Sequence, residues 1–221
     1  MGLYGLLSDG RLSVNGTRRD AGHGRQAGRH PGNGRICRRD VRGFEVDLPA
    51  TVVRQAELVL AAIGKIPATG VYVPVDYRND GLDGALESVG YDSKRKTLFV
   101  CEGVTRYIDA AAVDRFMRFI TGNTAPGSSV VFDYMPLGAV QGDFERCPDI
   151  RRLSFWVAYR GKPLVFGIRK GDSAAYVSQH GLKVMSDLAP KDLEKRYLTC
   201  SDGSLDGPCA SAFRIMHAAA P

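Results

Sequence analysis

The chain has 221 residues, of which 44% are hydrophobic and 24% are charged, and its formal net charge is +6. This composition indicates a soluble globular protein with one sizeable core, and it excludes a helical membrane protein because no apolar run approaches the ~18 residues needed to span a bilayer. The five cysteines are odd in number and lack metal-ligand spacing, so we expect free thiols in a reducing compartment, the cytoplasm, and no metal site.

Residues 1–43 differ from the rest of the chain. They contain nine arginines, three aspartates and no lysine, so they hold the whole excess of positive charge, and ten of them are glycine. Such a stretch cannot bury enough apolar surface to offset its ordering entropy, which predicts a disordered tail. Two functional alternatives are a basic arm for nucleic acid and a phosphate-binding glycine loop. No apolar strand precedes the glycine pairs at 22 and 24 or 32 and 34, so neither alternative is favoured.

From Phe44 onward, predicted strands and helices alternate. The expected strands are "FEVDLP" (44–49), "GVYVPVDY" (70–77), "TLFVCE" (97–102), "SSVVFDYM" (128–135), "GLKVMSDL" (181–188) and "AFRIMHA" (212–218). Helices are expected after Pro49 and Asp109, at 82–89, 171–179 and 190–197, and in an insert at 137–162. This alternation is typical of a parallel sheet with helices on both faces. We therefore predict one α/β domain over residues 44–221.

Two of these helices carry apolar residues at the spacing of a single helix face. The first begins at Pro49 and is expected to end at Gly64. The second is expected to be capped by Asp109. The positions predicted to face the core are Val52, Ala56, Val59 and Ile63 in the first helix and Val113, Phe116, Met117 and Ile120 in the second.

Three acidic residues end successive predicted strands: Asp47, Asp76 and Glu102. In an open parallel sheet, ligands bind outside the carboxyl ends of the strands, and a carboxylate there commonly accepts hydrogen bonds from ribose hydroxyls. For each acid alone, a solvated strand end or a helix cap is the favoured explanation. The set of three points to a nucleoside cofactor, without choosing between a dinucleotide and S-adenosylmethionine.

The residues themselves resemble a known family. "FEVDLPATV", "VYVPVDYRND", "LFVCEGVTRYIDAAAVDRFM", "PGSSVVFDYM" and "GLKVMSDLAPKDLEKRYL" are similar to segments of the leucine carboxyl methyltransferase-like family of S-adenosylmethionine-dependent O-methyltransferases, which includes polyketide O-methyltransferase-like members. The likeness runs from about residue 44 to residue 218. It implies a class I methyltransferase, Rossmann-like sheet, S-adenosyl-L-methionine as cofactor and a small-molecule acceptor.

The resemblance also implies roles for particular residues. Asp47 would hold the cofactor ribose, Asp76 and Tyr77 would lie against the adenine, and Glu102 would lie near the methionyl end. Tyr107 either shapes the pocket or packs beside the helix. No dedicated catalytic residue is implied, because the cofactor carries the reactivity and the protein positions and desolvates the reactants.

One part of the family pattern is absent from this sequence. Members begin with an apolar first strand and a glycine-rich loop about 20 residues before the E-V-D-x-P motif, where this chain has its Arg/Gly-rich segment. The first strand lies between the second and fourth, so its loss would leave two ladders of backbone groups unpaired. We therefore expect a truncated, inactive chain of marginal stability that binds S-adenosylmethionine poorly, unless residues 35–43 supply a strand.

Other side chains leave alternatives open. His180 and His217 could act as bases, but a surface or strand-packing position is favoured for both. Phe155, Trp156 and Tyr159 could line an acceptor pocket or pack a helix onto the core. The rival functions are a nicotinamide-dependent oxidoreductase, which lacks its G-x-G-x-x-G turn here, and a non-catalytic remnant or binding protein that uses the arginine-rich tail.

Overall fold

The computed structural model describes residues 3–8, 41–68, 70–76 and 79–221. Its strands are β1 (Leu3–Ser8), β2 (Arg42–Asp47), β3 (Gly70–Pro74), β4 (Thr97–Cys101), β5 (Ser129–Tyr134), β6 (Lys183–Leu188) and β7 (Arg214–Ala219). Its α-helices are α1 (Pro49–Ile63), α2 (Leu82–Ser88), α3 (Ala110–Gly122), α4 (Leu137–Val140), α5 (Pro148–Tyr159), α6 (Ser173–Gln179) and α7 (Pro190–Leu193). A 3₁₀ turn at Thr105–Tyr107 and a π-helical turn at Glu194–Leu198 complete the regular structure of these residues.

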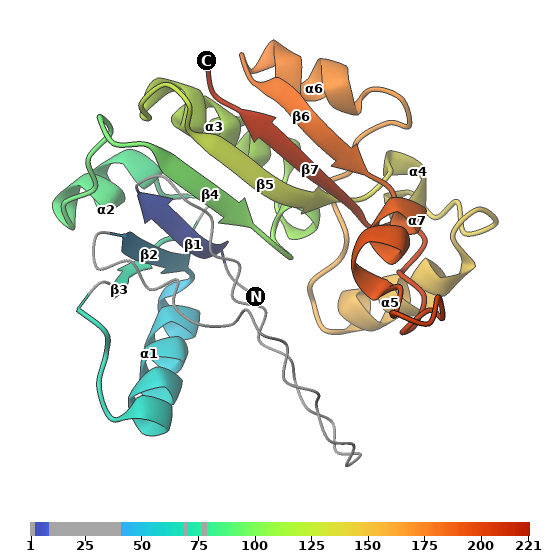
Figure 1. The fold of residues 1–221 in the computed structure, drawn as a ribbon, viewed down its shortest axis with the longest axis horizontal. Coiled ribbons are helices and arrows are strands. Elements are labelled where there is room, and N and C mark those ends of the chain that lie inside the picture. The colour runs from blue at the N-terminus through green and yellow to red at the C-terminus, as the bar shows by residue number, and fades with distance from the viewer. Residues whose placement is uncertain (1–2, 9–40, 69, 77–78) are drawn as a thin grey trace.

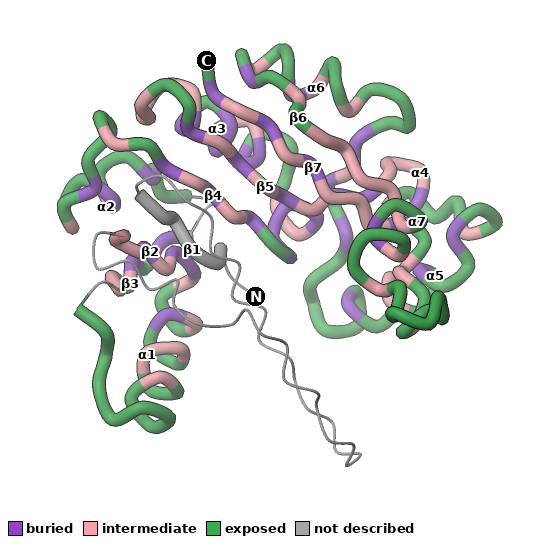
Figure 2. The backbone as a smooth tube through the Cα atoms, viewed as in Figure 1, coloured by how far each residue is buried: buried purple, intermediate pink, exposed green. Residues whose placement is uncertain are grey.

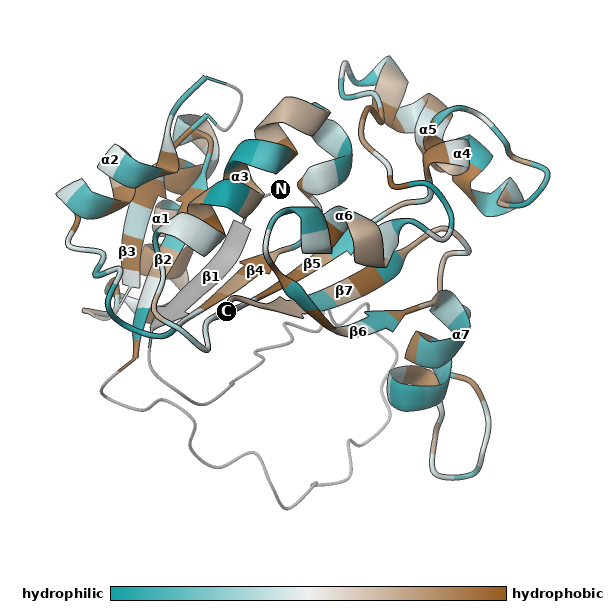
Figure 3. Ribbon diagram, turned by 90° about the horizontal axis from the view of Figure 1, so that it is seen from above, coloured by the Kyte–Doolittle hydropathy of each residue, from teal (hydrophilic) through white to brown (hydrophobic). Residues whose placement is uncertain are grey.

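The strands form one sheet in the order β3-β2-β1-β4-β5-β7-β6 (Figure 1). β2 pairs with β3 in parallel, and β4 pairs with β5 in parallel. β1 is antiparallel to both β2 and β4, and β7 is antiparallel to both β5 and β6. Strands β2 to β6 therefore all point the same way, and the predicted α/β class is confirmed. Helices α2, α3 and α6 lie along one face of the sheet, whereas α7 lies on the opposite side beyond β6 (Figure 3).

The place between β2 and β4 is filled by β1, which corrects two expectations. Residues 3–8 were expected to belong to a disordered tail, and the sheet was expected to lack its first strand. The other tail residues, 1–2 and 9–40, lie outside the described part of the chain, and β2 begins at Arg42, not at residue 44. The physical reason is that the facing edges of β2 and β4 need backbone partners, which the short apolar run "LYGLLS" supplies.

The direction of β1 decides where it ends. Ser8 pairs with Arg42 and with Thr97, which are the first residues of β2 and β4. The chain therefore leaves β1 at the edge of the sheet opposite to the carboxyl ends of β2, β3 and β4.

The core lies between the sheet and α3, where Figure 2 shows buried segments in β4, β5 and α3. Phe99 of β4 is fully buried and meets the rings of Phe116 and Phe119 edge to face, with centroid distances of 6.3 and 6.1 Å. The predicted cap is confirmed, because the Asp109 carboxylate accepts a hydrogen bond of 2.8 Å from the amide of Ala112. The four α3 positions predicted to face the core are all buried: Val113, Phe116, Met117 and Ile120.

The predicted apolar face of α1 is only partly buried. The helix ends as predicted at Gly64, whose φ of 73° is the left-handed conformation that glycine adopts without strain. Val52 packs against the sheet, but Ile63 is 57% exposed, so its predicted burial is wrong. The reason is geometric: a helix of 15 residues extends past the short β2 and β3, and its last turns project beyond the sheet (Figure 1).

Replacing Phe99 by alanine tests this core. Phe99→Ala is expected to lower the free energy of unfolding by about 3–5 kcal/mol, because it opens a cavity against two aromatic rings. The measurement is urea denaturation followed by far-UV circular dichroism. Phe155→Ala is the matched control, since Phe155 is 77% exposed on α5 and a surface change stays within about 0.5 kcal/mol. Equal losses in the two variants would contradict this description of the core.

Candidate functional site

The three acids lie at one edge of the sheet. Asp47 is the last residue of β2, Glu102 directly follows β4, and Asp76 lies two residues beyond β3. Because β2, β3 and β4 run in the same direction, their carboxyl ends share this edge, which we call the acidic edge. Tyr77, the fourth residue implied for the site, lies outside the described residues.

Asp47 is buried at this edge, with only 3% of the residue exposed. Its carboxylate accepts a hydrogen bond of 2.7 Å from the amide of Leu48. Burial raises the pKa of Asp47, and the Leu48 hydrogen bond and the charge of Lys162 offset this only in part. Burial also raises the pKa of Glu45, which shares the same strand face, and the charge of Asp47 raises it further. A ligand can therefore reach Asp47 only if the groups that cover it move.

Asp76 belongs to a tight acidic turn. Its amide donates to the carboxylate of Asp80 at 2.8 Å, and the side-chain amide of Asn79 donates to the Asp76 carboxylate at 3.2 Å. These bonds join the end of β3 to the residues that precede α2. Asp76 is half-buried, whereas Asp47 is almost fully buried.

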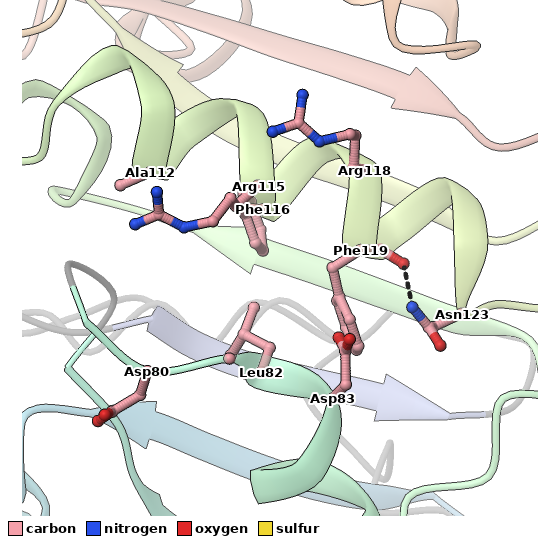
Figure 4. Close-up of a pocket in the computed structure, with 10 residues that line it drawn as sticks. Asp80, Leu82, Asp83, Ala112, Arg115, Phe116, Arg118, Phe119 and Asn123 are labelled. Carbon is pink, nitrogen blue, oxygen red and sulfur yellow. Dashed lines mark hydrogen bonds between the residues drawn. The ribbon is translucent and has the colours of Figure 1, made fainter.

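A hollow of about 280 Å³ lies beside this turn, between α2 and α3 (Figure 4). Asp80 and Asp83 line it on one side, Arg115 lines it on the other, and Phe116 and Phe119 form its apolar part. Neither Asp47 nor Glu102 lines this hollow. It is a surface depression on the helix-covered face, and it borders the acidic edge at Asp80, which accepts a hydrogen bond from the Asp76 amide.

Glu102 is exposed, while the turn that follows it is buried. Gly103 has a φ of 71°, so the chain reverses immediately after Glu102 in a conformation that favours glycine. The Gly103 amide donates to the carboxylate of Asp133 on β5 at 2.8 Å, and Arg106 forms an ion pair with the same carboxylate. The glutamate is thus presented to solvent by a turn that is fixed from β5.

Asp133 and Arg106 were not singled out from the sequence. The signal available was a charged residue inside the apolar strand pattern "SSVVFDYM" and an arginine inside "EGVTRY". Charges in buried segments are paired, so a pair between neighbouring strand ends could have been proposed. The register that makes them neighbours, Cys101 opposite Phe132, follows only from the structure.

The aromatic side chains of α5 and Tyr107 differ in their exposure. Phe155, Trp156 and Tyr159 are 77%, 53% and 81% exposed on α5, so they do not pack that helix onto the core. Tyr107 is half-buried and lies against the guanidinium of Arg106, at 5.2 Å from the ring centroid.

Neither candidate histidine lies at the acidic edge. His180 comes three residues before β6 begins, which places it at the opposite edge, where its ring lies 3.1 Å from the Asp114 carboxylate. His217 sits within β7, where burial lowers its pKa. Both histidines have packing roles in the described structure.

Residues 30–121 match the family model for leucine carboxyl methyltransferase. A protein of Mycolicibacterium vanbaalenii named "Putative S-adenosyl-L-methionine-dependent methyltransferase" is 36% identical over 104 residues, which make up 47% of this chain and 33% of that protein. A protein of the same name from Mycobacterium sp. (strain KMS) is 29% identical over 171 residues, covering 73% of this chain and 54% of that protein. The matches thus span between a third and about half of the relatives' length.

The fold is also similar to solved structures. A DUF574 family protein from Streptomyces avermitilis superposes with a TM-score of 0.54 at 17% identity, over 80% of this chain and 64% of that one. The mitomycin 7-O-methyltransferase MmcR superposes with a TM-score of 0.50 at 15% identity, over 81% of this chain and 42% of that one. At these identities the likeness concerns the fold alone. Among the described residues, no helix has the length and apolar character required to cross a bilayer.

The raised pKa of Asp47 has a consequence for stability. A carboxyl group whose pKa is higher in the folded than in the unfolded state destabilises the fold when it is ionised, and this cost disappears below the ordinary pKa of 3.8. Asp47→Asn keeps an oxygen that can accept from Leu48. It is therefore expected to raise the free energy of unfolding at neutral pH, with a gain that fades as the pH falls toward 3.8.

Denaturation in urea over a series of pH values measures this effect. Asp149→Asn is the control of opposite sign: burial would raise the pKa of Asp149, but the hydroxyl and amide of Ser211 both donate to its carboxylate and hold the pKa below 3.8. That variant is expected to lose stability at neutral pH. A loss of stability in Asp47→Asn at neutral pH would refute the buried-charge description.

Proposed function

We propose, on the premise that residues 30–121 are related to the leucine carboxyl methyltransferase family, that the chain binds S-adenosyl-L-methionine at the acidic edge. The proposed reaction is methyl transfer to a carboxylate or hydroxyl oxygen of a small molecule. The observation that carries the proposal is the placement of Asp47, Asp76 and Glu102 at the carboxyl ends of three strands that run in the same direction.

The chemistry of these side chains fits the cofactor. Its ribose hydroxyls and its ammonium group are hydrogen-bond donors, and carboxylates are the strongest acceptors among side chains. The exposed Glu102 would take the methionyl ammonium, the half-buried Asp76 would lie at the adenine side, and Asp47 would take the ribose once the groups that cover it move. When bound, S-adenosylmethionine supplies an electrophilic methyl group.

The chain's own part in the reaction would be to hold and desolvate the reactants. The buried turn from Gly103 to Arg106 keeps Glu102 at the edge and excludes water from behind it. No described histidine lies at this edge. A carboxylate acceptor is already ionised at neutral pH and would need no protein base.

A second candidate is a non-catalytic remnant, and one observation favours it. β1 ends beside Arg42 and Thr97, at the edge opposite to the three acids. A loop that follows β1 directly therefore starts at the wrong edge to meet the cofactor. The acids would then supply one wall of a pocket only, and the ordering cost of the missing wall would fall on binding.

A thermal-shift titration with S-adenosylhomocysteine separates the two candidates. If the chain binds, the melting temperature should rise with the logarithm of ligand concentration once the site saturates. Glu102→Gln is expected to weaken binding by roughly tenfold or more, since a hydrogen bond to a charged group contributes about 1.5–3 kcal/mol. Glu57→Gln is the matched control, because Glu57 pairs with Arg54 on the exposed face of α1.

Three results of this titration would each remove part of the proposal. The absence of any shift up to millimolar ligand would favour the remnant. A shift with NAD in place of S-adenosylhomocysteine would favour the oxidoreductase. Equal affinity in Glu102→Gln and wild type would remove Glu102 from the site.

The acceptor is proposed to contact α5. Phe155, Trp156 and Tyr159 expose aromatic surface there, and the guanidinium of Arg160 lies 4.9 Å from the Trp156 ring. Aromatic faces beside a cation suit an aromatic acid, which can stack and pair at the same time.

Trp156 is the single tryptophan of the chain, so its fluorescence reports on α5. Benzoate is expected to quench this emission saturably, and Arg160→Gln is expected to weaken the quenching several-fold through loss of the charge. Arg54→Gln on α1 serves as the control. Quenching that is linear in benzoate and equal in all three proteins would indicate collisions only and would exclude the site.

A further inference from the structure

Asp133 holds the turn behind Glu102 with both carboxylate oxygens and its backbone carbonyl. One carboxylate oxygen accepts from the Gly103 amide at 2.8 Å, and the other pairs with the Arg106 guanidinium. Its backbone carbonyl accepts from the Thr105 hydroxyl at 2.6 Å. A single residue of β5 therefore fixes three of the four residues that follow Glu102.

The Arg106 side of this arrangement is also fixed. The guanidinium lies between two rings, 4.6 Å from the centroid of Phe213 and 5.2 Å from that of Tyr107. The Arg106 carbonyl accepts from the Val165 amide at 2.9 Å. Side-chain exposure is 9% for Arg106 and 12% for Asp133, so the ion pair is almost fully withdrawn from water.

A pair this deeply buried is a poor source of stability. The free-energy cost of desolvating two charges can exceed the energy of their attraction. Apolar residues of similar volume often stabilise a protein as well as such a pair, or better. The pair is better explained by geometry, because it fixes where the turn lies relative to β4 and β5. What that geometry presents to solvent is Glu102, the exposed residue next to a buried turn.

We propose that Asp133 is a positioning residue, which holds the Gly103–Arg106 turn so that the Glu102 carboxylate stands at the acidic edge, where it meets the cofactor. Asp133 itself touches no ligand and acts through Glu102. This role rests on the proposed binding of S-adenosylmethionine. The role concerns the affinity for the cofactor and is separate from any contribution of Asp133 to folding.

The chain offers a matched control in Asp187. This carboxylate also stands near the carboxyl end of a strand, β6, and pairs with an arginine, Arg214, at 3.1 Å. It accepts hydrogen bonds from Tyr134, Ser173 and Arg214, none of which belongs to the Glu102 turn. Asp133→Asn and Asp187→Asn should both lower the melting temperature, because each leaves an arginine without its counter-charge. Only Asp133→Asn should weaken S-adenosylhomocysteine binding, by about tenfold.

A double-variant cycle tests whether Asp133 acts through Glu102. If it does, Glu102→Gln combined with Asp133→Asn should lose little more affinity than Glu102→Gln alone. Arg106→Gln breaks the pair from the other side and should reproduce the loss if Asp133→Asn folds poorly. Additive losses in the cycle, or an equal loss in Asp187→Asn, would overturn the positioning role.

Hydrogen exchange of the Gly103 amide separates this inference from the proposed function. The amide should be protected in the ligand-free wild type and should lose protection in Asp133→Ala but not in Asp187→Ala. Equal exchange in all three proteins would refute the bracing, whatever the ligand does. A protected Gly103 in a wild type that binds no cofactor would show the bracing to be structural only, and the positioning role would fall together with the proposed function.

Discussion

The sheet depends on what pairs with the facing edges of β2 and β4. These edges present rows of backbone amides and carbonyls in the middle of the sheet, and each buried group left unpaired costs about 1–3 kcal/mol. Against a total stability of about 5–15 kcal/mol, a vacant place would not be tolerated. β1 fills it and joins the β3-β2 pair to the rest of the sheet. An antiparallel strand satisfies these groups as well as a parallel one, but it delivers the chain to the other end of the sheet.

Buried charged residues have different structural roles at different strand ends. The Asp133–Arg106 pair fixes a turn at the acidic edge, while Asp187 and Arg214 join β6 and β7 and hold the hydroxyls of Tyr134 and Ser173. At Asp47, burial raises the pKa. The environment of this strand end, predicted to bind the ribose, therefore disfavours the ionised form of the carboxyl group.

Local sequence patterns predicted helix ends and the buried helix face of α3 well, because residues close together in the sequence determine these features. The Asp109 cap, the Gly64 terminus and the α3 core face each depend on residues within a few positions of one another. The acids at strand ends were also found, since strand direction follows from the alternation of strands and helices. The features that were missed depend on distant partners: the strand β1, the exposure of Ile63, and the pairing of Asp133 with Arg106. Register and the limits of the sheet determine these, and neither can be read from a window of sequence.

The projecting end of α1 shapes how the molecule behaves in solution. Val53, Leu58, Leu60 and Ile63 are each more than half exposed on α1. This helix therefore adds apolar area to a surface that also exposes the aromatic residues of α5. Salts that are excluded from protein surfaces strengthen contacts between such patches. Ammonium sulfate should therefore promote contacts between molecules at exposed apolar surfaces such as that of α1.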